Sequence, residues 1–225
     1  SPNEVANRLD WLISPEETLS HLNEITSFVD EVREHFTHAL LLGMGGSSLA
    51  PEVFSLAFGK EEEYLDIEVL DSTDPGNVLE YAEKFDPKKT LYIVSTKSGG
   101  TIETLSFFKY FFTHCKNIIG EYTGKHFVAI TDPGSKLEEM GKELGFRKIF
   151  INNPNIGGRY SVLSFFGTVP AALLGIDLEK LLNRANMVAD ESKNESSTSG
   201  DIGLVMAELA RKGRDKLTFI YSDQI

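Results

Sequence analysis

Three short stretches of the chain combine residue types that bind anions. The first, residues 40–48, reads LLLGMGGSS: an apolar run, three glycines and two serines. Glycine lets a ligand approach the backbone closely, and residues 49–58 are expected to form a helix. A loop between a strand and a helix start offers free N–H groups to an anion, most often phosphate. This loop, which contains Gly46 and Ser47, is a candidate phosphate site; a glycine-rich turn without a ligand is the alternative.

The second stretch, residues 95–101, reads STKSGGT and holds four hydroxyls, one lysine and two glycines in seven residues. Hydroxyl and N–H groups satisfy phosphate oxygens, and a lysine adds a point charge. The hydroxyls of Thr96, Ser98 and Thr101 and the amine of Lys97 are therefore further candidates for binding phosphate. A capped, solvated turn with Lys97 in water is the alternative.

The third stretch, residues 155–161, reads NIGGRYS, in which two glycines precede a single arginine, Arg159. An arginine in such a loop is suited to stabilise negative charge that develops on a substrate oxygen. A surface arginine paired with an acid is the alternative. The five histidines lie outside the three stretches and none has metal-ligand spacing, so we expect no metal site.

The elements around these stretches alternate between strand and helix. Short apolar runs predict strands that begin near residue 39 and at 66, 91, 126 and 148. Strict alternation with short loops predicts an α/β fold, a three-layer sandwich in which helices cover both faces of a five-stranded parallel sheet. Ligands bind at the carboxyl ends of the strands in such sheets. All three stretches fall at that edge, so we expect them to converge.

Capping residues mark several of the expected helix starts. Ser14 and Glu17 have the spacing of a capping box, and so do Ser135 and Glu138. Asp74, followed by a proline, predicts another N-cap.

The composition restricts the partners of the chain. Its 34 acidic residues outnumber 22 basic ones, for a net charge of -12, which argues against binding nucleic acid or an anionic membrane surface. No apolar run is long enough to span a bilayer. The single cysteine, Cys115, allows no internal disulfide and indicates a reducing, cytoplasmic setting.

Nucleotide binding is the weaker interpretation of the glycine-rich loops. Lys97 precedes its glycines, unlike the lysine of a Walker loop, and the glycines within residues 43–46 are too closely spaced for a dinucleotide fingerprint. Asp71, after the second expected strand, is the residue that would contact a ribose. We expect no cofactor.

The motifs GMGGSSLAPEVF, STKSGGTIET and GGRYSVLSFFG, in this order and at about this spacing, resemble the phosphoglucose isomerase family. The resemblance covers roughly residues 40–225 and matches the first sugar-isomerase (SIS) domain of the family, which is flavodoxin-like. The opening RLDWL, residues 8–12, is similar to bacterial forms in which a transaldolase is fused ahead of the isomerase.

The resemblance implies interconversion of glucose 6-phosphate and fructose 6-phosphate, a step of glycolysis and gluconeogenesis, without a cofactor. It implies that Arg159 is catalytic, held near the enediol oxygens. It also implies a set of residues that bind the substrate phosphate: Gly46, Ser47, Thr96, Lys97, Ser98 and Thr101. The family usually has serine at the position of Thr96.

One departure from the family limits the expected activity. The family's glutamate base lies in a Glu-Ser-Asn-Gly-Lys motif well beyond the arginine, and no such motif occurs in these 225 residues. Its ring-opening histidine and late lysine are absent too. Losing a general base typically costs about 10²–10⁴-fold in rate, so we expect this chain alone to bind phosphosugars with little isomerase activity. The alternative is a non-catalytic phosphosugar-sensing module, which has less need of Arg159.

The expected organisation has three parts. Residues 1–37 form an N-terminal helical segment, 38–175 the phosphosugar-binding SIS domain, and 176–225 connecting helices and the first strand of a second half. That strand is predicted at residues 217–221, where LTFIY reads as a buried run. A missing second half would leave an apolar face exposed, so association into a homodimer is also expected.

Overall fold

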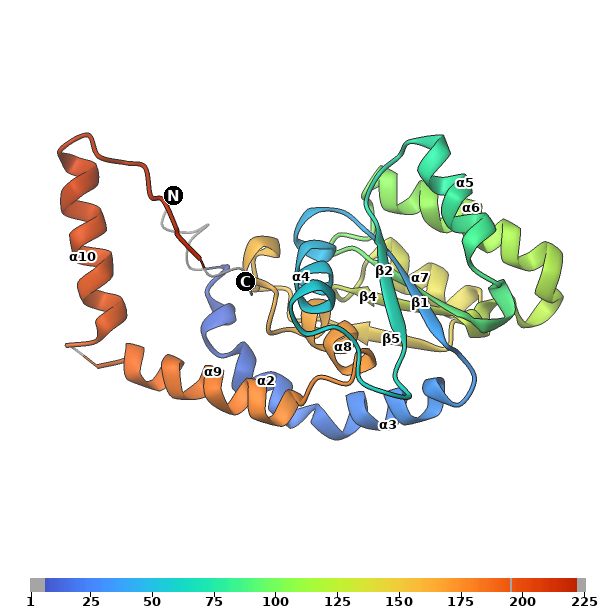
Figure 1. The fold of residues 1–225 in the computed structure, drawn as a ribbon, viewed down its shortest axis with the longest axis horizontal. Coiled ribbons are helices and arrows are strands. Elements are labelled where there is room, and N and C mark those ends of the chain that lie inside the picture. Colours follow the sequence, from blue (N-terminus) through green and yellow to red (C-terminus); the bar gives the residue numbers. More distant parts are fainter. Residues whose placement is uncertain (1–6, 195, 222–225) are drawn as a thin grey trace.

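The computed structural model describes residues 7–194 and 196–221. Its centre is a five-stranded sheet in the order β2-β1-β3-β4-β5, in which every pair of neighbours is parallel (Figure 1). The strands are β1 (His38–Gly43), β2 (Asp66–Leu70), β3 (Thr90–Ser95), β4 (Phe127–Thr131) and β5 (Lys148–Ile151). The predicted five-stranded parallel α/β fold is confirmed.

Helices lie between the strands and at both ends of the chain, and most of them pack around the sheet. They are α2 (Ser14–Ser20), α3 (Leu22–Arg33), α4 (Leu49–Phe58), α5 (Pro75–Lys84), α6 (Ile102–Ile119), α7 (Lys136–Glu143), α8 (Phe165–Leu173), α9 (Leu178–Ser192) and α10 (Thr198–Arg211). Among the described residues, no helix is both long and apolar enough to cross a membrane.

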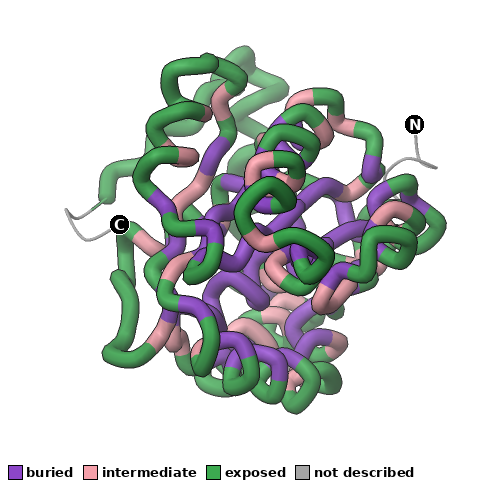
Figure 2. The backbone as a smooth tube through the Cα atoms, turned by 90° about the vertical axis from the view of Figure 1, so that its right-hand side faces the viewer, coloured by how far each residue is buried: buried purple, intermediate pink, exposed green. Residues whose placement is uncertain are grey.

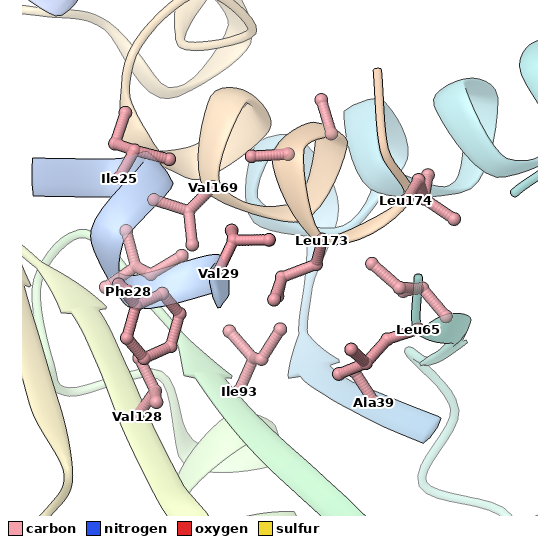
Figure 3. Packing of buried hydrophobic residues seen from close by; sticks show 14 of the residues in the cluster. Ile25, Phe28, Val29, Ala39, Leu65, Ile93, Val128, Val169, Leu173 and Leu174 are labelled. Atoms are coloured by element: carbon pink, nitrogen blue, oxygen red, sulfur yellow. The ribbon is translucent and has the colours of Figure 1, made fainter. Parts of the chain in front are cut away.

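The first core lies between one face of the sheet and helices α3, α4, α8 and α9. Ala39 of β1 and Ile93 of β3 face this side, where Val29 of α3 and Leu173 of α8 pack against them (Figure 3). Both faces of the central strands are apolar, as expected for a parallel sheet buried between two layers. Figure 2 shows the buried backbone gathered in the interior, with exposed segments around it.

The second core, on the opposite face, is aromatic. Tyr92 of β3 stacks on Phe127 of β4, with ring centroids 4.9 Å apart, and Phe111 of α6 packs on Tyr92 at 5.5 Å. Cys115 is buried here as a free thiol, and burial raises its pKa to about 11. The thiol therefore stays protonated at neutral pH.

Two of the three predicted caps form. The Asp74 carboxylate accepts hydrogen bonds from the N–H groups of the next helical turn, and the Ser135 hydroxyl accepts one from Glu138. The capping box predicted at Ser14 was wrong. Ser14 lies inside α2 and donates to the Trp11 carbonyl, 2.9 Å away, while the carboxylate of Glu17 is engaged by a distant loop.

The C-terminal part differs from the prediction. Helix α9 packs along α2, whereas α10 extends away from the sheet and has no buried residue (Figure 1). The strand predicted at residues 217–221 is absent: these residues have no regular structure and are exposed. A strand needs a neighbour for its N–H and C=O groups, and no described strand lies beside this segment. The division into three parts stays a prediction.

The contrast between α9 and α10 predicts that shortening a leucine side chain to alanine lowers the stability of the protein in α9 but not in α10. Leu182 of α9 is fully buried in the first core, and Leu204 of α10 is 69% exposed. We expect Leu182→Ala to lower the free energy of unfolding by about 2–4 kcal/mol, and Leu204→Ala to change it by less than about 0.5 kcal/mol. Urea unfolding followed by circular dichroism measures both. Equal losses would show that the α10 face is covered in solution.

Candidate functional site

Three loops leave the carboxyl ends of the strands on the same edge of the sheet. The first loop, residues 44–48, follows β1; the second loop, residues 96–101, follows β3; the third loop, residues 152–161, follows β5. Since all strands are parallel, the loops emerge side by side. The sequence separates each loop from the next by about fifty residues, and the contacts below show that the fold joins them.

The first loop is bonded to the last residue of β3, from which the second loop continues. The Ser95 hydroxyl, at the end of β3, donates to the carbonyl of Ser47 at 3.2 Å. A Cβ on Gly43 would lie 3.1 Å from the Ser95 carbonyl oxygen and 3.2 Å from that of Ser47. The absence of a side chain at Gly43 therefore lets the chain turn tightly beside β3.

The first and third loops touch at two glycines. A Cβ placed on Gly46 would lie 2.0 Å from the carbonyl oxygen of Gly158, a distance that no real side chain tolerates. The Ser161 hydroxyl also approaches the Gly46 carbonyl, at 3.5 Å. Gly46 and Arg159 line a common pocket of about 310 Å³, whose apolar wall includes Val53. Ser47 and the second loop are not part of its lining.

The second and third loops are joined by the side chain of Lys97. Its amine forms an ion pair with Asp132, the residue after β4, and donates to the Pro154 carbonyl at 2.8 Å. Burial raises the pKa of Asp132, and the nearby Lys97 amine partly opposes this rise. The other carboxylate oxygen of Asp132 is buried without a partner among the described residues. The Lys97 amine is therefore engaged by the protein, in contrast to the solvated or anion-facing lysine expected from sequence.

At one residue, Gly99, the second loop has a backbone conformation that favours glycine. Gly99 has a φ of +66°, and a Cβ there would lie 2.8 Å from the backbone nitrogen of Leu137 and 2.9 Å from the Cβ of Ser135. This tight packing against the start of α7 sets the position of the loop.

Four backbone N–H groups in the first two loops have no partner among the described residues. Among the hydrogen bonds of the described residues, none has the N–H of Gly46, Lys97, Ser98 or Gly99 as donor. Helices α4 and α6 begin at the ends of these loops, and neither has a side-chain cap. Uncapped helix starts together with free N–H groups favour an anion.

The hydroxyls of the same loops surround these N–H groups. Ser47 is half-buried, and within the described chain its hydroxyl has no partner. The hydroxyls of Thr96 and Thr101 contact one another at 3.1 Å. The Ser98 hydroxyl accepts only a long bond from the Gly100 N–H, at 3.3 Å. These groups retain capacity to bind a further oxygen.

Arg159 is the cation of the third loop that remains unpaired. Arginine ion pairs in the described part of the chain involve Arg33, Arg147 and Arg211. Arg159 is exposed and makes none. A guanidinium without an internal partner keeps its five donors for a ligand.

Two contributors to this edge were not among the predicted site residues. The first is Asp132, whose place directly after β4 could have suggested the contact with Lys97. The second is Trp11, which stacks on Tyr160 beside Arg159, with ring centroids 5.6 Å apart. No local sequence signal announces that contact, because residues 11 and 160 lie far apart in the chain.

Comparison with known proteins gives the family. The phosphoglucose isomerase family model matches residues 17–211. The chain belongs to the phosphoglucose isomerase family. Within this family, the glucose-6-phosphate isomerase of Carboxydothermus hydrogenoformans is 34% identical over 203 residues, which cover 86% of this chain and 43% of that protein. The resemblance inferred from the three motifs is confirmed.

Two solved structures share the fold of this chain. A hypothetical protein of Thermus thermophilus superposes with a TM-score of 0.83 at 32% identity, over 90% of this chain and 48% of that one. A glucose-6-phosphate isomerase of Chlamydia trachomatis gives 0.69 at 24% identity, over 79% of this chain and 34% of that one, and so supports the fold. The chain spans less than half the length of these relatives.

The contact between Gly46 and Gly158 predicts an asymmetric response to alanine. Gly46→Ala forces two backbones apart, and we expect it to lower the free energy of unfolding by about 1–3 kcal/mol. Gly158→Ala is the matched control: a Cβ there meets nothing within 4 Å, so the expected change is below about 0.5 kcal/mol. Urea unfolding compares the two. Equal effects would mean that the loops do not touch in solution.

The ion pair between Lys97 and Asp132 predicts a pH-dependent loss of stability. Because the folded-state pKa of Asp132 is raised, the protein holds this proton more tightly than the unfolded chain does, and that contribution fades as pH rises through the folded pKa. Lys97→Met removes the charge that opposes this rise. We expect it to cost about 1–3 kcal/mol at about pH 7, where ionising Asp132 would leave a half-buried carboxylate without its partner, and less at about pH 4.

Thermal unfolding at the two pH values tests this expectation. Lys136→Met is the matched control, because Lys136 is exposed and lies in the same region of the fold. A loss for Lys97→Met that is equal at both pH values would exclude the ion pair as its cause.

Proposed function

We propose that this chain is the phosphosugar-binding portion of a glucose-6-phosphate isomerase, which interconverts glucose 6-phosphate and fructose 6-phosphate in the cytoplasm. The observation that carries the proposal is the convergence of three loops, two with free N–H and hydroxyl donors and one with an unpaired arginine. The names of the relatives support the same reaction. The proposed partner is a sugar phosphate, and association into a homodimer belongs to the proposal.

The phosphate would bind at the first two loops. The proposed ligands are Gly46, Ser47, Thr96, Lys97, Ser98 and Thr101. Lys97 would take part through its backbone N–H, since its amine is held by Asp132 and Pro154. Free N–H groups, hydroxyls and two uncapped helix starts supply donors for the phosphate oxygens. This local supply of donors accounts for anion binding by a chain whose net charge is -12.

Arg159 would act at the other end of the sugar. Moving a proton between C1 and C2 passes through an enediolate, whose oxygen carries negative charge. A guanidinium placed at that oxygen stabilises the charge as it develops. The proton transfer also requires a base, and the Glu-Ser-Asn-Gly-Lys sequence in which the family carries it does not occur in these residues. Binding, rather than turnover, is therefore the appropriate readout for this chain.

The proposal predicts how two variants change the binding of two ligands. One ligand is glucose 6-phosphate; the other is a five-carbon aldonate phosphate, whose carboxylate mimics the enediolate. We expect Ser47→Ala to weaken both ligands equally, because both carry the phosphate. Arg159→Met should weaken the aldonate phosphate by about 10–100-fold, the effect of losing one charged hydrogen bond, with a smaller effect on glucose 6-phosphate. Isothermal titration calorimetry measures all four affinities.

Competing interpretations give different results in the same experiment. A sensing module would bind both ligands with little dependence on Arg159. A nucleotide-binding domain would be stabilised by NAD rather than by glucose 6-phosphate, which a melting-temperature shift detects. Either outcome would contradict the proposed function.

A further inference from the structure

The N-terminal segment, residues 9–17, lies outside the sheet but contacts the loop that carries Arg159. Leu9 forms an antiparallel β-bridge with Ile156, a buried residue of the third loop. The indole of Trp11 stacks on the ring of Tyr160, with an interplanar angle of 24°. These contacts lie on either side of Arg159 in the chain, three residues before it and one after it.

Two carboxylates extend the contact on its polar side. Asp10 accepts hydrogen bonds from the side-chain amides of Asn153 at 3.1 Å and Asn155 at 3.2 Å. Glu17 accepts a second bond from the Asn153 amide at 2.9 Å. The side-chain oxygen of Asn153 accepts a hydrogen bond from the backbone N–H of Asn155 at 2.9 Å. The polar atoms of Asn153 are thereby occupied, and bonds to charged acceptors are the stronger kind.

The rest of the third loop is held by contacts within the loop and by the other two loops; from the second loop, the Lys97 amine donates to the Pro154 carbonyl. The Ser161 hydroxyl donates to the Gly158 carbonyl at 2.8 Å, and Gly158 meets Gly46. Arg159 itself has no ion-pair partner in the described chain. The region that its guanidinium can reach is therefore set by where the loop backbone is held. Residues 9–17 contact the loop on both sides of Arg159, in addition to the contacts from the other two loops.

We propose that Asp10, Trp11 and Glu17 are positioning residues that place Arg159 against the reacting end of the sugar. This inference rests on the proposed function. A guanidinium displaced by about 1 Å from a developing charge loses much of its effect, while phosphate bound at the first two loops is unaffected. Loss of the segment's contacts should therefore impair recognition of the enediolate more than recognition of the phosphate.

The test compares the aldonate phosphate with inorganic phosphate, in the 225-residue chain. The quantity compared is the affinity for the aldonate phosphate divided by the affinity for inorganic phosphate. We expect Asp10→Ala combined with Glu17→Ala to lower this ratio by about tenfold. Glu16→Ala is the matched control: Glu16 is an exposed carboxylate on the same helix and should leave the ratio unchanged. Calorimetry gives both affinities, and circular dichroism verifies that each variant is folded.

A second pair of variants tests the aromatic contact independently of the carboxylates. Trp11→Leu should lower the ratio of the two affinities. Trp11→Phe should leave it near the value of the parent chain, because phenylalanine keeps a ring against Tyr160. A purely structural role would lower the melting temperature and both affinities together, or leave both affinities unchanged, and either result would overturn the inference. A parent chain that binds neither ligand would instead overturn the proposed function.

Discussion

The backbone contact between Gly46 and Gly158 is the constraint on which the candidate site depends. It joins the first loop, which follows the inner strand β1, to the third loop, which follows the outermost strand β5. A single methyl group at Gly46 would occupy the space between them. The parallel arrangement of the strands brings the loops to one edge, but this contact sets their separation. The distance from the proposed phosphate end to Arg159 follows from it.

Two cations at this edge of the sheet, Lys97 and Arg159, differ in whether the described part of the chain pairs them. Lys97, which seemed the natural phosphate ligand, is paired with Asp132 and ties the second loop to the third. Neutral N–H groups and the Ser47 hydroxyl of the first two loops remain without partners in the described chain, and so does the guanidinium of Arg159; these are among the groups proposed to bind the substrate. The arrangement separates a cation that is paired within the protein, Lys97, from one that is unpaired among the described residues, Arg159. Under the proposed function, an acidic protein would bind an anion through donors that act over a few ångströms, within the screening length.

The fold and the site contribute different evidence about function. Sugar-isomerase-like sheets support many activities, so a shared fold with low identity identifies an architecture rather than a reaction. The three motifs are more specific, because each supplies the donors that one part of a phosphosugar requires. The N-terminal segment adds a feature that neither the fold nor the motifs imply: contacts with the arginine loop from outside the sheet.

Local patterns in the sequence determined the strands, most helix starts and the edge where the loops gather. The cap at Asp74, for example, depends only on its neighbours. Tertiary structure decided the rest: Glu17 leaves its expected capping role for Asn153, 136 residues away, and Lys97 pairs with Asp132. The segment at 217–221 has strand-forming residues yet forms no strand, since pairing requires a neighbour. Partners distant in sequence leave no periodic signal, so only the folded chain reveals them.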